Sequence, residues 1–281
     1  MMEMFHTVSQ FCSEITTKQY STSFSSAISL LHKDLRQPVY NIYGFVRFAD
    51  EIVDTFHEYD KPVLLAQFKQ ETFDAIERRI SLNPILNSFQ KTVNEYGIDQ
   101  QLIRAFFQSM EMDLVEKKYN TRDFGEYVYG SAETVGLMCL YIFCAGRKDL
   151  YEELQAPARS LGAAFQKVNF LRDFKSDYKS LSRMYFPNCN FDGFTTDNKT
   201  QIEIDIEADF SNAYKGILRL PMKARFGVYV AYKYYMSLFK KIKRMKPAVV
   251  LESRVRIPNY YKAIIVLRAG LKNQMGLIKD A

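Results

Sequence analysis

The sequence predicts an all-α protein. Apolar residues recur at spacings of three and four along most of the chain, which is the pattern of a helix with one buried face. Residues typical of helix starts precede several of these segments, and the strict alternation that marks a strand is rare and short. These three observations indicate helices joined by short turns, without a sheet.

The helical periodicity is clearest in three segments. Apolar residues repeat on one face over 63–76, 102–114 and 226–238. Each segment is long enough for at least about three turns. Each is therefore expected to bury one face against a core.

Helix-start signals support these segments. Asp60 and Asn83 each stand just ahead of a proline, the order expected for an N-cap followed by proline in the first turn. Thr200 and Glu203 have the spacing of a capping box. Prolines at positions 38, 62, 84, 187, 221, 247 and 258 are expected to divide the chain into about ten helices.

The composition suits a single domain over 1–281. A chain of 281 residues buries roughly three quarters of its unfolded surface, and 47% hydrophobic residues are ordinary for a globular protein. The loop-like stretch 185–200 is expected to be an excursion within that domain. Aromatic residues reach 15%, with 22 Phe, 19 Tyr and no Trp. They indicate either an aromatic-rich core or an apolar cavity for a long apolar ligand.

The net charge of +6 favours anionic partners. The densest basic run, 240–246, is interpreted as a solvated helix face, with membrane-surface contact as the alternative. The remaining basic residues are dispersed and no nucleic-acid-binding motif is present in the sequence, so we expect no nucleic-acid partner.

The cysteines and histidines indicate neither a disulfide scaffold nor a thiol or imidazole metal site. The cysteines form no CxxC pair and the histidines are scattered, so a reducing compartment is expected. The N-terminal segment MMEMFHTVSQF lacks the basic and apolar regions of a secretory signal. The longest near-apolar stretch, 136–146, is short of the roughly 20 residues that span a bilayer. We therefore expect a cytoplasmic protein, at most peripheral on the inner face of the membrane.

The segment 40–56 carries an acidic stripe. Tyr43, Arg47, Asp50 and Asp54 follow one another at offsets of 0, 4, 7 and 11. At about 100° per residue they fall within roughly 60° of one another on one helix face. The remaining residues of this segment are mostly apolar, which predicts a largely buried helix with two carboxylates and an arginine on one side.

A matching stripe lies in the segment 163–178. Gln166, Asn169, Asp173 and Asp177 follow at offsets of 0, 3, 7 and 11, again with apolar neighbours. Two solvated acids are the ordinary explanation of one such pair. Two matching pairs in apolar surroundings favour a shared site instead.

Two facing helices with paired aspartates could hold a diphosphate through Mg²⁺, because this ion commonly binds through carboxylates together with substrate phosphates. Arg47 and Arg172 would add direct phosphate contacts. A di-iron bundle is the rival interpretation, but it needs Glu-x-x-His motifs, and the sequence has none.

Five segments stand in order along the chain, namely YSTSF at 20–24, DEIVD at 50–54, YVYGSAETVG at 127–136, NFLRDFKSD at 169–177 and RMYFP at 183–187. Through these segments the chain resembles the squalene/phytoene synthase family over nearly its whole length. Each segment alone would be a weak signal, whereas five at suitable spacing are specific.

The resemblance implies an all-α, isoprenoid-synthase-type helical bundle around a central apolar cavity, and an enzyme that joins two isoprenoid diphosphates. By this resemblance the metal would be Mg²⁺, with Mn²⁺ as an alternative, held by Asp50, Glu51, Asp54, Asp173 and Asp177. The catalytic residues would be Tyr127, Arg47 and Arg172. The substrate would contact Ser21, Ser23, Phe24, Tyr43, Arg47, Val135, Gly136, Gln166, Asn169, Arg172 and Arg254.

Two departures from the family pattern stand out. Glu51 replaces an aspartate of many relatives but keeps the carboxylate. Many relatives place a tyrosine shortly before the residue that Arg254 matches, whereas this chain reads AVVL at 248–251. The role of that tyrosine is therefore either absent from this chain or carried by a residue at another position.

The segments YGFVRFADEIVD and AAFQKVNFLRD look most like the corresponding segments of bacterial phytoene synthases of carotenoid biosynthesis. That likeness implies condensation of two geranylgeranyl diphosphates to phytoene through a cyclopropyl diphosphate, without NADPH. Ala27 and Ile28 are not bulky, which leaves depth for a long chain. The alternatives are a thirty-carbon squalene or dehydrosqualene-type synthase that uses farnesyl diphosphate, and a non-catalytic lipid-binding or assembly homologue.

Overall fold

The computed structural model describes residues 2–115, 118–181, 183–187, 189, 193–252 and 254–278. Within these residues the chain is helical, apart from turns and one isolated parallel bridge between Lys118 and Met184. The elements are α1 (Met2–Tyr20), α2 (Thr22–Ser29), α3 (Lys33–Asp54), α4 (Lys61–Arg78), α5 (Pro84–Tyr96), α6 (Gln100–Asp113), α7 (Thr121–Val128), the π-turn η1 (Tyr129–Glu133), α8 (Thr134–Cys144), α9 (Lys148–Leu181), α10 (Thr196–Arg219), α11 (Met222–Lys243), α12 (Pro247–Val250) and α13 (Asn259–Gln274). The all-α prediction is confirmed.

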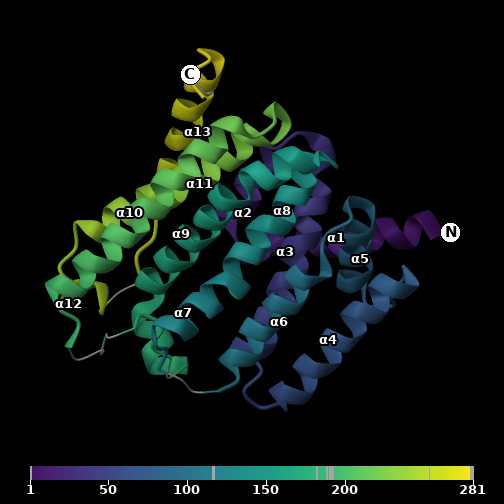
Figure 1. Cartoon of the computed structure of the whole chain (residues 1–281), viewed down its shortest axis with the longest axis horizontal. Helices are drawn as coiled ribbons and strands as arrows, with labels where there is room; N and C mark the ends of the chain where they lie inside the picture. The colour runs from purple at the N-terminus through teal and green to yellow at the C-terminus, as the bar shows by residue number, and fades with distance from the viewer. Residues whose placement is uncertain are drawn as a thin grey trace.

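The helices form a bundle in which α3 and α9 share the neighbour α8 but otherwise pack on different helices (Figure 1). The 34-residue helix α9 packs against α8, α10 and α11, whereas α3 packs against α1, α5 and α8. Both predicted acidic stripes lie on these two helices. The two stripes therefore approach the same interior from different parts of the bundle.

The apolar core has two clusters, one on each side of that interior. The first gathers around α3, α5 and α6, where the rings of Phe45 and Phe89 stack with centroids 3.8 Å apart. The second gathers around α9, α10 and α11, where Phe210 and Phe239 are buried. Much of the aromatic content is thus ordinary core.

Local signals placed most helix starts correctly. The side chain of Asp60 accepts a hydrogen bond from the Val63 backbone N–H, and Asn83 caps α5 in the same way. The capping box predicted at Thr200 is wrong, because α10 begins four residues earlier, at Thr196. The actual box pairs Thr195 with Asn198. Asparagine replaces the usual Glu or Gln at the third helical position, so the usual pattern misses it.

The predicted break at Pro38 is also wrong. Pro38 lies inside α3, and Pro157 lies inside α9. A proline removes the hydrogen bond to the carbonyl one turn earlier, and tertiary packing can outweigh that cost. The basic run 240–246 closes α11 as an exposed face, where Lys243 pairs with Glu207 at 2.5 Å.

The helical run Thr121–Cys144 joins α7, η1 and α8. By length and composition it could cross a membrane, but half of its apolar window is buried inside the structure. It is longer than the apolar stretch 136–146 because the π-turn carries the helix through without a break. The run packs on α6 and α9, which is the position of a core helix.

Candidate functional site

A cavity of about 570 Å³ lies between α3 and α9, with further walls from α2, α8, α10 and α11. Its two ends differ chemically. One end is lined by small and apolar side chains, including Ala27, Ile28, Leu31, Phe143, Leu154 and Ile217. The other end carries aspartates and arginines. A molecule with an anionic head and a long apolar tail fits such a polarity.

The polar end contains both predicted aspartate pairs, Asp50 and Asp54 from α3 and Asp173 and Asp177 from α9. Burial, followed by the neighbouring charge of Asp54, raises the pKa of Asp50 to about 7. Burial, followed by the charges of Asp173 and Asp54, raises the pKa of Asp177 to about 8. The two helices thus bring like charges close enough to repel, and a cation would relieve that repulsion.

These oxygens fit Mg²⁺ only together with a ligand. Among the residues that the structure describes, no three His, Cys, Asp or Glu side chains converge closely enough to hold a metal ion. Mg²⁺ is commonly bound by one or two carboxylates with waters and phosphate oxygens, rather than by an all-protein cage. The donor set therefore suits an ion that arrives with, or is completed by, a diphosphate.

Three arginines surround the aspartates. Arg47 donates to Asp50 at 2.5 Å and also to Glu51. Arg172 donates to Asp173 at 2.5 Å, and Arg254 lies 2.8 Å from the same carboxylate. Within the described part of the chain, Arg47 Nε is buried without a hydrogen-bond partner, which leaves an N–H for a ligand oxygen.

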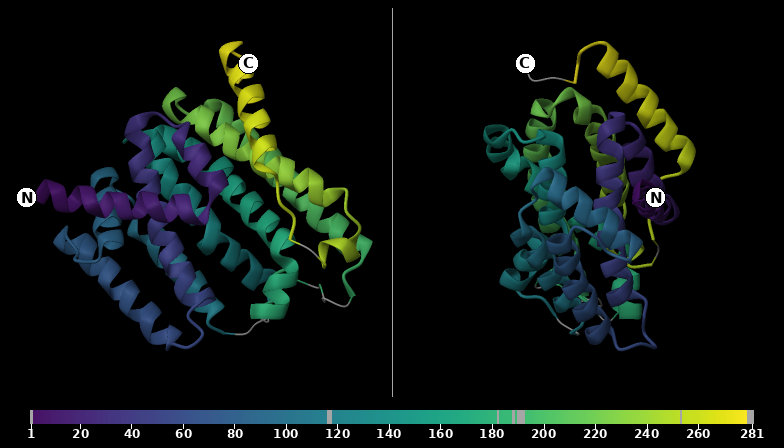
Figure 2. Two further views of the ribbon diagram at one scale, coloured as in Figure 1. Left: turned by 180° about the vertical axis from the view of Figure 1, so that it is seen from behind. Right: turned by 90° about the vertical axis from the view of Figure 1, so that its right-hand side faces the viewer.

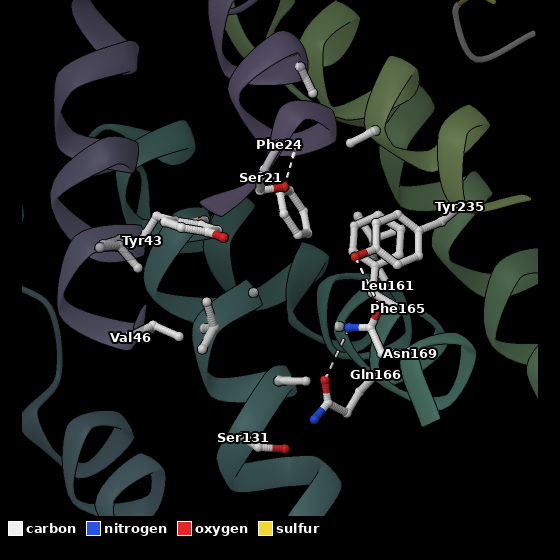
Figure 3. Close-up of a pocket in the computed structure, with 18 of the residues that line it drawn as sticks. Ser21, Phe24, Tyr43, Val46, Ser131, Leu161, Phe165, Gln166, Asn169 and Tyr235 are labelled. Carbon is white, nitrogen blue, oxygen red and sulfur yellow. Dashed lines mark hydrogen bonds between the residues drawn. The ribbon is translucent and has the colours of Figure 1, made fainter. Parts of the chain in front are cut away.

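Small polar and aromatic side chains line the middle of the cavity (Figure 3). Ser21 caps α2 by accepting from the Phe24 backbone N–H at 3.1 Å. On the opposite wall, Tyr235 donates to Asn169 at 3.3 Å and stacks on Phe165 with centroids 4.0 Å apart. Burial raises the pKa of Tyr43 to about 12, so its hydroxyl stays protonated.

The cavity lining includes every predicted site residue except two. Ser23 is half-buried but does not line the cavity. Glu51 points instead to Arg47, with which it forms an ion pair on the same helix. Glu51 directly follows Asp50, and adjacent residues lie about 100° apart on a helix, so Glu51 is turned away from the face that lines the cavity.

The central glycines permit close helix packing, and one of them, Gly136, is also part of the cavity wall. A Cβ on Gly136 would lie 2.9 Å from the carbonyl oxygen of Ala158, so α8 approaches α9 closely there. Gly136 also lines the cavity, as does Val135. A Cβ on Gly130 would lie 2.5 Å from the carbonyl oxygen of Ala105.

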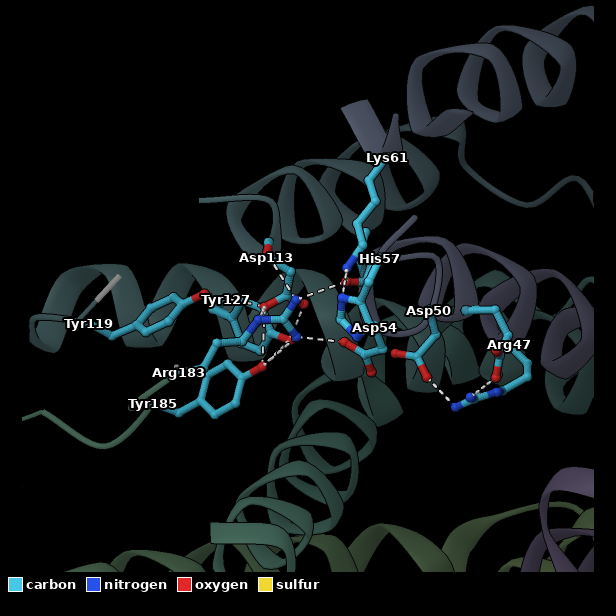
Figure 4. Close-up of polar contacts among 12 residues, drawn as sticks. Arg47, Asp50, Asp54, His57, Lys61, Asp113, Tyr119, Tyr127, Arg183 and Tyr185 are labelled. Atoms are coloured by element: carbon cyan, nitrogen blue, oxygen red, sulfur yellow. Dashed lines mark hydrogen bonds and ion pairs between the residues drawn. The ribbon is translucent and has the colours of Figure 1, made fainter. Parts of the chain in front are cut away.

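A buried polar network borders the acidic end (Figure 4). Tyr127 donates to Asp113 at 2.7 Å, and Tyr185 donates to the same carboxylate at 3.2 Å. Arg183 lies 3.4 Å from Asp113 and donates to Asp54 at 2.6 Å. Burial raises the pKa of Asp113 to about 6, although the charge of Arg183 opposes the shift. The network links a cavity tyrosine to one of the predicted metal ligands.

Sequence reasoning missed Asp113 and Tyr235. Asp113 has no acidic partner one turn away on α6, so a search for paired carboxylates passes over it. Tyr235 lies on the apolar face of α11, where the sequence indicates only a core residue. Tyr235 nevertheless brings a hydroxyl from α11 to the site, where it lies beside Asn169 and Arg172 of α9.

Comparisons with known proteins agree with this arrangement. The sequence profile of the family described as squalene/phytoene synthase matches residues 17–203. The 4,4'-diapophytoene synthase of Staphylococcus haemolyticus is 27% identical over 71% of this chain and 69% of its own length. The phytoene synthase of Arthrospira platensis is 26% identical over 94% and 92%, and chloroplastic phytoene synthase 1 of Solanum lycopersicum is 28% identical over 82% and 60%.

Solved structures show the same fold. A dehydrosqualene synthase crystallised with a ligand superposes with a TM-score of 0.82 at 21% identity, over 96% of this chain and 98% of that one. The squalene synthase HpnC from Alicyclobacillus acidocaldarius superposes with a TM-score of 0.72 at 18% identity, over 84% and 93%. These likenesses confirm the isoprenoid-synthase-type helical fold. With its profile matched over 17–203, the chain belongs to the squalene/phytoene synthase family.

Proposed function

We propose that this protein joins two geranylgeranyl diphosphates head to head and forms phytoene, a step of carotenoid biosynthesis. The observation that carries the proposal is the polarity of one continuous cavity, which has aspartates and arginines at one end and apolar walls at the other. Membership of the family supports a prenyl transferase, and several relatives are named phytoene synthases.

The acidic end would bind the diphosphate groups. Asp50, Asp54, Asp173 and Asp177 would hold Mg²⁺, and the chemistry that this ion supplies when bound is neutralisation of the leaving diphosphate. Mn²⁺ would serve in the same position. Arg47 lines the cavity, and its buried Nε–H lacks a hydrogen-bond partner in the described residues, so its guanidinium would donate to a diphosphate oxygen as charge develops there.

The reaction needs two ionisations. Loss of diphosphate from one molecule leaves an allylic cation. The double bond of the second molecule attacks this cation, and loss of a first proton closes the ring to a cyclopropyl diphosphate. Loss of the second diphosphate, rearrangement and loss of one proton then give the hydrocarbon and two diphosphates. No electron donor is required, so we propose no role for NADPH.

The cavity walls suit cationic intermediates. Phe24, Phe165, Phe170 and Tyr235 line the middle of the cavity, where ring faces can stabilise a passing cation. An apolar lining also excludes water, which would otherwise trap the cations. Tyr127 borders the acidic end, where its hydroxyl is held by Asp113.

The longer substrate is favoured by the apolar end of the cavity. Ala27 and Ile28 form part of its wall, and neither side chain is bulky. The alternative is a thirty-carbon synthase that uses farnesyl diphosphate, since one relative is named a 4,4'-diapophytoene synthase. A non-catalytic lipid-binding or assembly role is disfavoured because all four aspartates face the cavity together.

Product analysis tests the proposal. Purified protein with Mg²⁺ would be incubated with geranylgeranyl diphosphate or farnesyl diphosphate, with and without NADPH, and the hydrocarbons identified by mass. A forty-carbon phytoene formed without NADPH is the expected product. A thirty-carbon product alone would move the protein to the other branch, and a folded protein with no turnover of either substrate would reject catalysis.

A further inference from the structure

Helix α1 carries its apolar residues on the side that faces away from the protein. Four residues at offsets 0, 4, 7 and 11 have exposed fractions between 42% and 73%, namely Met4, Val8, Phe11 and Ile15. The buried side instead carries the hydroxyl residues Ser9, Ser13 and Thr17. At about 100° per residue the two sets lie on opposite sides of the helix. This order is the reverse of an ordinary surface helix.

Helix α13 repeats the arrangement. Its outward side carries Tyr260, Ile264, Leu267 and Leu271, and Met275 follows directly after its end; their exposed fractions lie between 37% and 71%. Its buried side carries Ile265 and Ala269. The first four outward residues have the same offsets as those of α1, so each helix presents a straight apolar stripe to solvent.

The helices that carry the two stripes lie on one side of the molecule. Seen from behind, α1 and α13 both lie in front of the bundle, and in the side view both stand at the same edge (Figure 2). A hydrogen bond of 2.7 Å from Lys262 Nζ to Thr22 Oγ1 ties α13 to α2, the helix that follows α1. We call the outward residues of both helices the α1/α13 face.

On the α13 side of this face, the charged residues are all basic. The segment 254–278 contains five basic residues, Arg254, Arg256, Lys262, Arg268 and Lys272, and no acidic residue. Arg268 and Lys272 are exposed and lie about 60–100° from the middle of the stripe. An apolar stripe with cations along one edge is the pattern of a helix that lies in the interface of an anionic membrane.

We propose that the α1/α13 face docks on the surface of an anionic phospholipid bilayer. A second copy of the chain would fit less well, because antiparallel pairing of two α13 helices through their stripes brings their basic edges together. The proposal rests on the proposed function in one respect. Long hydrocarbon chains dissolve in the bilayer, so docking there would bring the cavity next to its substrates and product. Ser21, which directly follows α1, and Arg254, which lies five residues before the start of α13, both line the cavity.

Vesicle flotation tests the docking. Full-length protein would be mixed with vesicles of equal parts phosphatidylcholine and phosphatidylglycerol, or of phosphatidylcholine alone. We expect flotation with the anionic vesicles and at least about tenfold weaker partition for the double variant Phe11→Ser, Leu267→Ser, because each change removes an apolar side chain from the interface. Ile204→Ser is the matched control, since Ile204 is 55% exposed on α10, which packs on α9 and α11.

A charge variant separates the two contributions. Arg268→Gln with Lys272→Gln should weaken binding to the anionic vesicles by about tenfold or more and leave binding to phosphatidylcholine unchanged. The proposal is overturned if the wild-type protein does not float, or if Phe11→Ser, Leu267→Ser floats as the control does. It is also overturned if light scattering shows a dimer that this double variant dissolves while vesicles bind neither protein.

The outcomes for docking and for catalysis are distinguishable. Activity measured on dispersed substrate without vesicles should be equal in the double variant and the wild type, because neither changed residue lines the cavity. A protein that binds vesicles but makes no hydrocarbon rejects the proposed reaction and leaves the docking surface in place.

Discussion

The hydroxyl of Tyr127 on α7 donates a 2.7 Å hydrogen bond to Asp113 at the end of α6. This contact fixes a cavity tyrosine from outside the cavity, because Asp113 itself is not part of the lining. Arg183 contacts Asp113 on one side and Asp54 on the other. The orientation of Tyr127 is thereby linked to one of the carboxylates proposed to hold the metal.

Asp113→Asn should therefore impair both stability and turnover. The change removes a buried negative charge beside Arg183, and breaking a buried pair commonly costs about 3–5 kcal/mol; Asp54 still pairs with Arg183, so we expect the lower end. Urea unfolding and steady-state kinetics measure the two effects. Tyr127→Phe keeps the charge pair, so it should lower kcat with a much smaller loss of stability. Equal kinetics for wild type and Asp113→Asn would contradict the positioning role.

Asp50→Asn and Asp173→Asn should each abolish turnover while leaving the helical circular dichroism spectrum unchanged. Each change removes one carboxylate from the proposed Mg²⁺ site without changing side-chain size much. Asp74→Asn on α4, whose side chain pairs with the exposed Arg78, is the matched control. Near-normal turnover in either site variant would contradict the metal assignment.

Mg²⁺ binding should strengthen as the pH rises from about 6 to about 8. The pKa of Asp50 is raised from 3.8 to about 7 and that of Asp177 to about 8, chiefly by burial, so protons compete with the metal in this range. A carboxyl with a raised native pKa stabilises the fold at low pH, and this contribution is lost as the pH rises through that value.

Thermal melts with and without Mg²⁺ measure this dependence. Without the metal, the wild-type protein should lose stability relative to Asp50→Asn between about pH 4 and pH 7. Stabilisation by Mg²⁺ should be larger at pH 8 than at pH 6 in the wild type, and smaller at both pH values in Asp50→Asn, which lacks one of the proposed ligands. Parallel pH profiles for the two proteins would show that Asp50 ionises normally.

Ile28→Phe should shift the product toward shorter chains. Ile28 is buried and lines the apolar end of the cavity, so a larger ring there shortens the space for the hydrocarbon tail. Competition between geranylgeranyl and farnesyl diphosphate, with products identified by mass, measures the ratio. Val63→Phe, at a 48% exposed position on α4, controls for the added ring. An unchanged ratio would mean that the tail does not reach Ile28.

Gly162→Ala should destabilise the protein by about 1–3 kcal/mol. Its Cβ would lie 2.5 Å from the carbonyl oxygen of Ala132, and backbone at the π-turn would have to shift. Gly125→Ala is the opposite case, because nothing lies within 4 Å of its Cβ and the site is inside α7. It should stabilise the protein by about 0.5–1 kcal/mol. Chemical denaturation of both variants measures the difference, and equal effects would contradict the tight packing of α9 on η1.

By itself, the sequence determined the helices and the chemical character of the site. Periodicity and caps depend on neighbours within one or two turns, so the helical segments 63–76, 102–114 and 226–238 could be predicted from spacing alone. The same local arithmetic placed Asp50 with Asp54 and Asp173 with Asp177 on single helix faces. The capping box at Thr195 and the continuation of α3 past Pro38 were missed, because an unusual cap and tertiary packing decided them.

Only the tertiary structure decided which of these residues meet. The meeting of the two stripes depends on how α3 and α9 border one cavity, which no spacing along the chain encodes. Asp113 joined the site because α6 ends beside Arg183 and Tyr127, although its own neighbours in sequence give no sign of it. Glu51 does not line the cavity, because the rotation of about 100° from Asp50 to the next residue of the helix turns its side chain toward Arg47. Contacts across the bundle depend on the packing of the whole chain, whereas helix faces depend on a few residues.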